Sequence, residues 1–216
     1  MPKPQHCCEN VVPVNAARSF SRHGEILDRR VVVELLERFK GRRVLEVGAG
    51  GLRNALYLQS KGYRVTVLEA KGILDRFPDK YEQFLSAGGR LVYSLPANAK
   101  FPIALATFVF ETICRPEQRI ALVSRIKECL LTNGALLISI RGPADLVTAH
   151  ASGKPCSDGF VTPNRSFSRS FTRDQLARLL QSGGFSRVEF LHKPDTKAPE
   201  YLHAIAWKDA TSKEER

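Results

Sequence analysis

Two carboxylates frame a glycine-rich turn in the stretch from 42 to 70. Glu46 lies two residues before Gly48, and Glu69 follows the turn at the distance where a carboxylate accepts hydrogen bonds from ribose hydroxyls. Glu46 is the more selective group, because it would repel a pyrophosphate on the turn and attract an ammonium or a sulfonium. The two acids therefore predict an adenosine ligand that has a positively charged tail and no phosphate.

The elements around the turn must place these acids in one crevice. Residues 44–47 form a short apolar run, 54–61 carry apolar side chains at helical spacing, and 64–68 form a second apolar run. A parallel strand–turn–helix–strand unit brings the turn to the carboxyl edge of a sheet, where nucleotide-like ligands bind. A dinucleotide is disfavoured, because its fingerprint needs Gly or Ala at the position that Arg53 occupies.

The same stretch resembles motif I and the following acidic position of class I methyltransferases that use S-adenosylmethionine (SAM). The segment GLRNALYLQSKGYRVTVLE is most similar to small methyltransferases of the tellurite-resistance type, in which an Arg-Asn pair follows the glycine turn. The resemblance implies that Glu46, Gly48 and Gly50 shape the methionine end of the SAM site and that Glu69 holds the ribose. Leu52 departs from this pattern, because the family has a third glycine there.

Another side chain with a predicted role at this site is Asn98. It follows the expected strand at 90–93, where related enzymes hold the adenine, and its side-chain carbonyl can accept a hydrogen bond from the adenine amino group. A loop asparagine without such a role fits the same position. The predicted cofactor-binding residues are Glu46, Gly48, Ala49, Gly50, Asn54, Glu69, Ala70 and Asn98.

The candidate catalytic residues follow the central strands. Residues 103–110 form a near-continuous apolar run, typical of a central parallel strand, and Glu111 comes directly after it. Glu111 can orient a substrate or accept its proton, or it can cap the following turn.

The stretch 141–171 is irregular and net basic. Long connections at this edge of the sheet are usually functional, and arginine forks suit carboxylate or phosphate groups. Its phenylalanines can stack on a flat ring or anchor the loop to the core. The expected substrate contacts are Arg141, His150 and Arg169, so the candidate catalytic set is Glu111, His150 and Arg169.

Apolar periodicity and turn residues predict the remaining elements. The helices are expected at 25–39, 73–85, 116–131 and 172–182, and the strands at 90–93, 135–140, 187–192 and 204–208. The last two strands should be antiparallel, because Pro194 and Pro199 leave no room for a crossover helix. The resemblance implies an α/β, Rossmann-like sheet of seven strands in the order 3-2-1-4-5-7-6, with strand 7 antiparallel and helices on both faces. We expect one domain over 1–216, with a leader or lid at 1–22 and a disordered tail at 209–216.

The composition indicates which binding partners and which cellular location to expect. The net charge is +11, but the basic residues are scattered, which favours a solvated surface over nucleic-acid binding. No apolar run approaches the roughly 20 residues that span a bilayer. The first ten residues contain no apolar signal core, so a cytoplasmic protein is expected. The five cysteines are predicted to be reduced thiols without a metal, although the adjacent Cys7 and Cys8 could be reactive or bind one.

These features predict a SAM-dependent methyltransferase that transfers a methyl group to an O, N or S atom of a small acidic or aromatic molecule. The methyl donor arrives activated, so positioning and desolvation are the main tasks of the protein. Two alternatives stay open: a methyltransferase acting on nucleic acid or protein, and a non-catalytic binding module that kept the fold.

Overall fold

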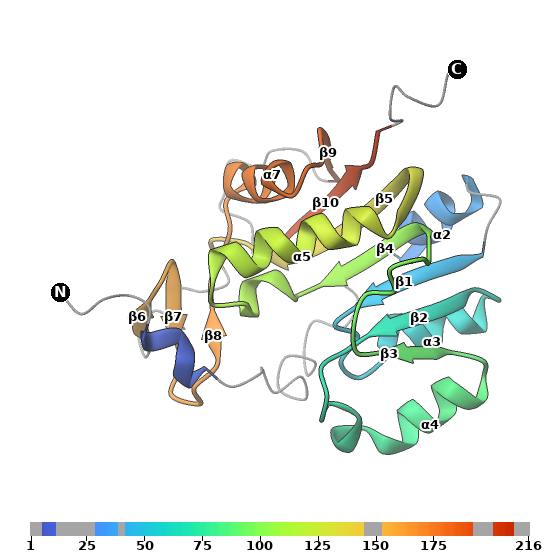
Figure 1. Cartoon of the computed structure of the whole chain (residues 1–216), viewed down its shortest axis with the longest axis horizontal. Coiled ribbons are helices and arrows are strands. Elements are labelled where there is room, and N and C mark those ends of the chain that lie inside the picture. The colour runs from blue at the N-terminus through green and yellow to red at the C-terminus, as the bar shows by residue number, and fades with distance from the viewer. Residues whose placement is uncertain (1–5, 12–28, 39–41, 145–152, 192–200, 210–216) are drawn as a thin grey trace.

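The centre of the molecule is a seven-stranded sheet. The computed structural model describes residues 6–11, 29–38, 42–144, 153–191 and 201–209. The strand order is β3-β2-β1-β4-β5-β10-β9 (Figure 1). The strands are β1 (Arg43–Val47), β2 (Arg64–Leu68), β3 (Arg90–Val92), β4 (Phe101–Thr107), β5 (Leu130–Arg141), β9 (Arg187–Phe190) and β10 (Tyr201–Trp207). β1 to β5 run parallel, and β10 is antiparallel to both β5 and β9. The predicted order and the antiparallel strand are therefore confirmed.

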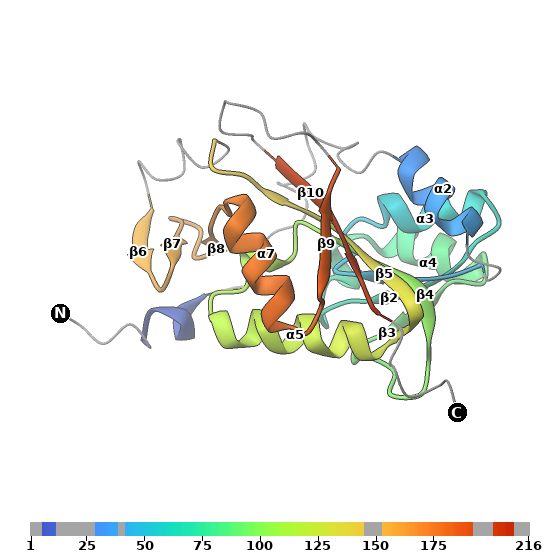
Figure 2. The ribbon, with the colours of Figure 1, turned by 90° about the horizontal axis from the view of Figure 1, so that it is seen from above.

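Helices cover both faces of this sheet (Figure 2). One face carries α2 (Arg29–Arg38), α3 (Arg53–Ser60) and α4 (Pro78–Ser86), and the other carries α5 (Pro116–Glu128) and α7 (Arg173–Ser182). Each face has its own apolar core: Leu58 and Phe84 are fully buried on the first, and Val123 and Leu180 on the second. Alternate residues of the central strands feed the two cores, as expected of strands that are buried on both faces.

The helix ends follow local chemistry. The predicted helix at 73–85 is split into the 3₁₀ turn η2 (Leu74–Arg76) and α4, because Pro78 occupies the first helical position of α4. The start of α7 is a capping box: the Thr172 hydroxyl accepts from the Gln175 backbone N–H at 3.2 Å, and the Gln175 side chain accepts from the Thr172 backbone N–H at 2.9 Å. Residues 25–28 and 39 of the first predicted helix lie outside the described residues.

The boundary between α5 and β5 differs from the prediction. The helix ends at Glu128 rather than 131, and β5 begins at Leu130 rather than 135. Leu130 is fully buried and pairs with Phe101 of β4. The Asn133-Gly134 pair, taken as a helix stop, lies inside the strand at an irregularity where Asn133 has a φ of 62°. The strand therefore begins before the Asn133-Gly134 pair, because Leu130 is already buried and paired with β4.

The prediction of an irregular stretch at 141–171 is wrong for its second half. Three short strands, β6 (Lys154–Cys156), β7 (Gly159–Val161) and β8 (Phe167–Ser168), form a separate antiparallel sheet. We call it the small sheet. It lies beside the 3₁₀ helix η1 (His6–Asn10), away from the main sheet (Figures 1 and 2). Strands of two or three residues carry too little alternation to be seen in the sequence.

The prediction of reduced, unpaired thiols is contradicted for four of the five cysteines. Cys7 is bonded to Cys156 and Cys8 to Cys114, with Cα–Cα distances of 5.8 Å in both pairs. Cys129 is free and buried. The bonds join η1 to the small sheet and to the segment before α5. Among the described residues, no helix is both long and apolar enough to cross a membrane.

Candidate functional site

The turn after β1 is closed by glycine conformations. Gly48 and Gly50 have φ values of +67° and +51°, in the left-handed region that favours glycine. A Cβ on Gly48 would lie 2.7 Å from Cγ2 of Val109, and the Gly48 N–H donates to the Leu68 carbonyl at 2.8 Å. Only a residue without a side chain lets the turn pass this close to the end of β4.

Leu52 adopts the same left-handed region at the start of α3. Its φ is 60° and its side chain is fully buried. A left-handed conformation costs an L-residue about 1–2 kcal/mol. Burying a leucine side chain gains about 1.5–3 kcal/mol. Leu52 therefore adopts the backbone conformation that the family's glycine would adopt. The burial of its side chain offsets the free-energy cost of the left-handed conformation.

Glu46 is buried beside this turn, with 2% of its surface exposed. Burial raises the pKa of Glu46 to about 7, an effect that Asn54 partly offsets and the nearby Glu69 reinforces. Its Oε2 atom has no hydrogen-bond partner among the described residues. A buried carboxylate oxygen without a donor suits a ligand that brings a positive charge.

Glu69 follows the end of β2 and closes the same site. Its two carboxylate oxygens accept backbone N–H bonds, from Gly50 at 2.7 Å and from Ala70 at 2.9 Å. Burial raises the pKa of Glu69, and these two bonds act in the opposite direction. Each oxygen keeps a second acceptor position, so ribose hydroxyls can still be bound. The Tyr81 hydroxyl donates to the Gly50 carbonyl at 3.1 Å and fixes the turn from the α4 side.

The other predicted cofactor residues occupy different environments. Ala49 is buried in the turn, and the Asn54 amide is 3.5 Å from the Thr107 hydroxyl at the end of β4. Ala70 and Asn98 are exposed, Asn98 in the loop between β3 and β4. The structure thus brings together the residues from 46 to 54 and Glu69, while the adenine contact of Asn98 stays a prediction.

Glu111 lies in the 3₁₀ turn η3 (Phe110–Thr112) and is completely buried. Its carboxylate is 3.9 Å from the Nε atom of Arg141, which ends β5. Its backbone carbonyl accepts from the Arg169 N–H at 3.2 Å. Glu111 therefore contacts both the end of β5 and the backbone at Arg169.

Arg169 is also buried, against expectation for a substrate contact. Its guanidinium pairs with Asp158 and lies 3.8 Å from the centre of the Phe171 ring. Burial lowers the pKa of Arg169 to about 10, although Asp158 opposes this shift. His150 lies outside the described residues. The substrate roles of both residues stay predictions.

The structure adds a polar row that sequence reasoning missed. Thr107, Ser139 and His203 are register partners on β4, β5 and β10, and they point to the same face as Glu46. The Ser139 hydroxyl is 2.9 Å from Nδ1 of His203. The signal in the sequence was one polar residue within each of three otherwise apolar strands. Recognising that these residues lie side by side requires the register of the strands, which the sequence alone does not give.

Two aromatic side chains stand next to this row. The rings of Phe108 and Tyr201 meet edge to face, with centroids 5.6 Å apart. Tyr201 is the register partner of Arg141. The carboxyl ends of β4 and β5 therefore combine an arginine, an aromatic pair and a buried Ser–His pair.

The fold and this site define a class I SAM-dependent methyltransferase. A family model described as a methyltransferase domain matches residues 21–189. The chain therefore belongs to the methyltransferase-domain family. A search of curated proteins finds no match.

Solved structures share the fold at low sequence identity. The 1,6-didemethyltoxoflavin-N1-methyltransferase of Burkholderia thailandensis, solved with 1,6-didemethyltoxoflavin and S-adenosylhomocysteine, has a TM-score of 0.64 and 20% identity over 91% of this chain and 83% of its own. CcbJ from Streptomyces caelestis has a TM-score of 0.63 and 16% identity, with coverages of 85% and 90%. The methyltransferase SibL has a TM-score of 0.62 and 18% identity, with coverages of 86% and 56%. This chain thus spans little more than half the length of SibL.

The residues present fit SAM as the cofactor of this enzyme. The Oε2 atom of Glu46, which has no hydrogen-bond partner among the described residues, suits the ammonium of the methionine end. The backbone at Gly48 carries no side chain, and a Cβ there would collide with Val109. Glu69 would hold the ribose, as its free acceptor positions allow. Bound SAM would supply a methyl group that its positively charged sulfur has activated, so the protein's task would be to position it against the acceptor.

Proposed function

We propose that this methyltransferase acts on a small molecule with an acidic or aromatic part. The observation that carries the proposal is the arrangement at the ends of β4, β5 and β10. Arg141 is 30% exposed and stands next to the Phe108–Tyr201 pair, on the sheet face that carries Glu46. A guanidinium recognises a carboxylate with a charged hydrogen bond, and the aromatic edges can contact a flat ring.

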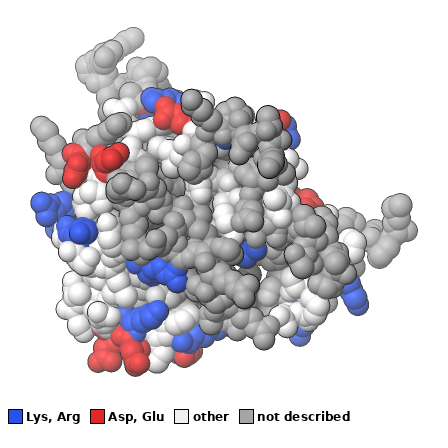
Figure 3. Space-filling view, turned by 180° about the vertical axis from the view of Figure 1, so that it is seen from behind, with Lys and Arg blue, Asp and Glu red and all other residues white. Residues whose placement is uncertain are grey.

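The charge distribution supports a small acceptor over a polyanion. On the face shown in Figure 3, the visible Lys and Arg side chains of the described residues lie in separate small groups, and the Asp and Glu groups lie toward the edges of the view. Nucleic-acid binding surfaces instead gather basic residues along one track. The net charge of +11 makes nucleic acid the main competing outcome of a substrate test.

His203 is the proposed proton acceptor when the methylated atom starts protonated. Its Nδ1 atom is 2.9 Å from the Ser139 hydroxyl, which fixes the ring orientation. A neutral imidazole nitrogen can accept a proton from a nucleophile within hydrogen-bond reach. Glu111 then has a positioning role, because its buried carboxylate faces Arg141.

We also propose that this enzyme belongs to the tellurite-resistance type of small methyltransferases. The support for this assignment is the Arg53-Asn54 pair directly after the glycine turn, which in the structure opens α3. The cytoplasmic location and the division into one domain over 1–216 stay predictions from the sequence.

A substrate survey with methyl-labelled SAM tests the proposal. The purified protein is offered small aromatic acids, total RNA, DNA and a protein extract in parallel. We expect label in the small molecules only. Transfer confined to RNA, DNA or protein would refute the proposal.

Two variants then locate the acceptor. Arg141→Gln should lower kcat/KM for acidic acceptors roughly 10- to 100-fold, the value of a charged hydrogen bond, without changing SAM affinity. Arg187→Gln, which removes the same charge from the exposed edge strand β9, is the matched control. His203→Gln should lower kcat by about 100-fold or more and change its pH profile. A normal kcat in this variant would exclude His203 as the proton acceptor.

A further inference from the structure

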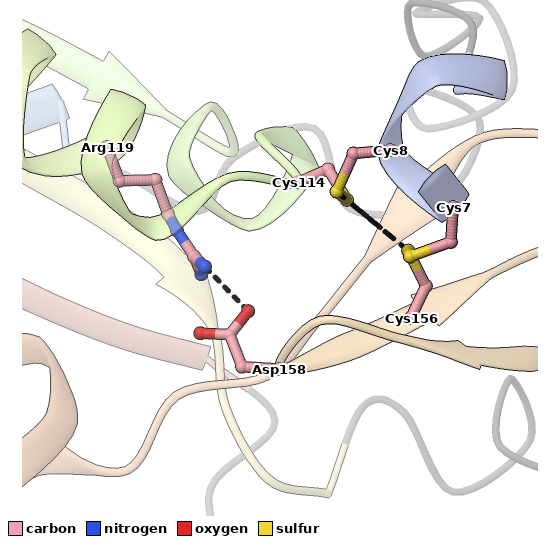
Figure 4. Close-up of a disulfide and its surroundings, with 6 residues drawn as sticks. All are labelled: Cys7, Cys8, Cys114, Arg119, Cys156 and Asp158. Atoms are coloured by element: carbon pink, nitrogen blue, oxygen red, sulfur yellow. Dashed lines mark hydrogen bonds and ion pairs between the residues drawn. A yellow bond between two sulfur atoms is a disulfide. The ribbon is translucent and has the colours of Figure 1, made fainter. Parts of the chain in front are cut away.

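Four cysteine sulfurs from three separate parts of the chain converge on one point. Cys7 and Cys8 come from η1, Cys114 from the segment before α5, and Cys156 from the end of β6 (Figure 4). All four sulfur atoms lie within 4.8 Å of one another. We propose that, in the reduced protein, these four cysteines bind one zinc ion as a closed structural site.

The distances between the two bonded pairs fit a tetrahedron. The Cys8 sulfur is 3.9 Å from that of Cys156, and the Cys114 sulfur is 3.5 Å from it. Four thiolates at the usual Zn–S distance stand about 3.8 Å apart. The other two distances between the pairs are at most 4.8 Å, so opening the two S–S bonds and small shifts of the side chains bring the four sulfurs to this spacing. The four sulfurs are too close together to enclose a cluster of several irons.

The convergence of all four sulfurs on one point favours a metal site over two independent disulfide bonds. Two disulfides would join these segments equally well if they were far apart, since each bridge acts independently. A four-coordinate ion, by contrast, requires that all four sulfurs face a common centre. Zinc prefers four thiolates in tetrahedral geometry, and a site with four protein ligands has no position left for substrate.

The surroundings suit thiolates. Cys114 and Cys156 are buried with Phe167, and Val11 and Val161 pack against them. Asp158, two residues after Cys156, pairs with both Arg119 and Arg169, so this group of ion pairs carries two positive charges and one negative charge. Figure 4 shows the Arg119–Asp158 pair to the left of the four cysteines, at the turn between β6 and β7. An excess of positive charge stabilises deprotonated sulfur.

The small sheet also needs such support. It has only short strands, and its apolar cluster holds three buried residues, two of them cysteines. A unit of this size cannot bury enough apolar surface to hold itself together, and small folds use metals or disulfides instead. Zinc would tie η1, the start of α5 and β6 to one another. Binding replaces the thiol protons, so four thiols and one Zn²⁺ give Zn(Cys)₄ and up to four released protons.

The test uses the full chain after a phosphine reductant has opened both disulfides, with two electrons for each. Zinc is added in slight excess, the unbound metal is removed, and zinc per chain is measured by mass spectrometry. We expect one zinc per chain and a higher Tm than in reduced, chelator-treated protein. Cobalt in place of zinc should give the absorption of tetrahedral thiolate coordination.

Matched variants locate the site. Cys8→Ser and Cys156→Ser should each lose stoichiometric zinc, whereas Cys129→Ser, which changes the free buried cysteine outside the cluster, should keep it. SAM binding reports whether each variant is folded. If a variant fails to fold, cobalt absorption in the wild type decides the question alone. Reduced wild-type protein that binds neither zinc nor cobalt, or a Cys156→Ser variant that keeps one zinc, overturns the proposal.

Discussion

The SAM site and the small sheet are built in opposite ways. The SAM site takes its carboxylates and turn from one continuous stretch, residues 46 to 70, and its backbone fixes the geometry. The small sheet depends on contacts between residues far apart in the chain: Cys7 with Cys156, and Arg119 with Asp158. A site from one stretch has its geometry set by local conformation. A site from distant stretches needs strong bonds or charges, because long loop closure costs entropy.

The largest effect is expected from Gly48→Val. The new side chain combines a φ of +67° with a contact 2.7 Å from Val109, which together should cost about 3 kcal/mol or more of unfolding free energy. SAM binding should fall below detection in calorimetry. Gly88→Val is the control, because Gly88 has a φ of +80° but open space, and this variant should bind SAM normally. Normal binding by Gly48→Val would show that the turn does not hold the cofactor.

Asp158→Asn should weaken the small sheet alone. It leaves the buried guanidinium groups of Arg119 and Arg169 without their carboxylate, at a cost of about 3 kcal/mol. Hydrogen exchange should rise across 153–168 and stay unchanged in β1 and β2, with SAM affinity preserved. Glu189→Gln, which breaks the exposed pair with Arg187, should change stability by less than about 0.5 kcal/mol. Faster exchange in β1 would mean that the two regions are coupled.

Glu46→Gln should separate binding from stability. The folded pKa of about 7 exceeds the usual 4.5, so the folded state keeps a proton that the unfolded state has lost between these values. Wild-type unfolding free energy should therefore fall as pH rises through this window, by up to about 3 kcal/mol. The variant should lack this fall in urea titrations at pH 5 and pH 8.

The same variant should bind SAM about 10- to 100-fold more weakly at pH 8, because a charged hydrogen bond is lost. Wild-type SAM affinity should decrease as pH falls below about 7, since the carboxyl group must first lose its proton. Calorimetry across this range measures both trends. An affinity independent of pH would argue against a contact between Glu46 and the ammonium.

The smallest expected effect is the difference in stability between two substitutions of Leu52. Leu52→Ala should cost about 3 kcal/mol through lost burial, and Leu52→Gly about 1 kcal/mol less, because glycine relieves the left-handed conformation. Glycine is also preferred over alanine at an N-cap, the position that Leu52 occupies in α3. Denaturant titrations of the pair would measure the combined preference of this position for glycine. An alanine variant more stable than the glycine variant would contradict it.

The sequence predicted those features whose residues lie close together along the chain. The sheet order followed from the resemblance together with the succession of apolar runs, and the acids at 46 and 69 were recognised from their distance to the turn. The small sheet was missed because its strands are two or three residues long. The Ser139–His203 pair was missed because it exists only through the register of β5 and β10. The burial of Arg169 depended on Asp158, whose sequence position gives no sign of that partner.

The position of Cys7 and Cys8 also sets an order of events during synthesis. Both cysteines leave the ribosome early, whereas Cys156 follows Cys7 by 149 residues. At roughly 5–20 residues per second, the first thiols wait about 7–30 s for their last partner. The bond between Cys7 and Cys156 therefore forms only after β1 to β5 have emerged from the ribosome. A truncation between residues 114 and 156 would release a polypeptide in which Cys8 can still reach Cys114 but Cys7 lacks Cys156.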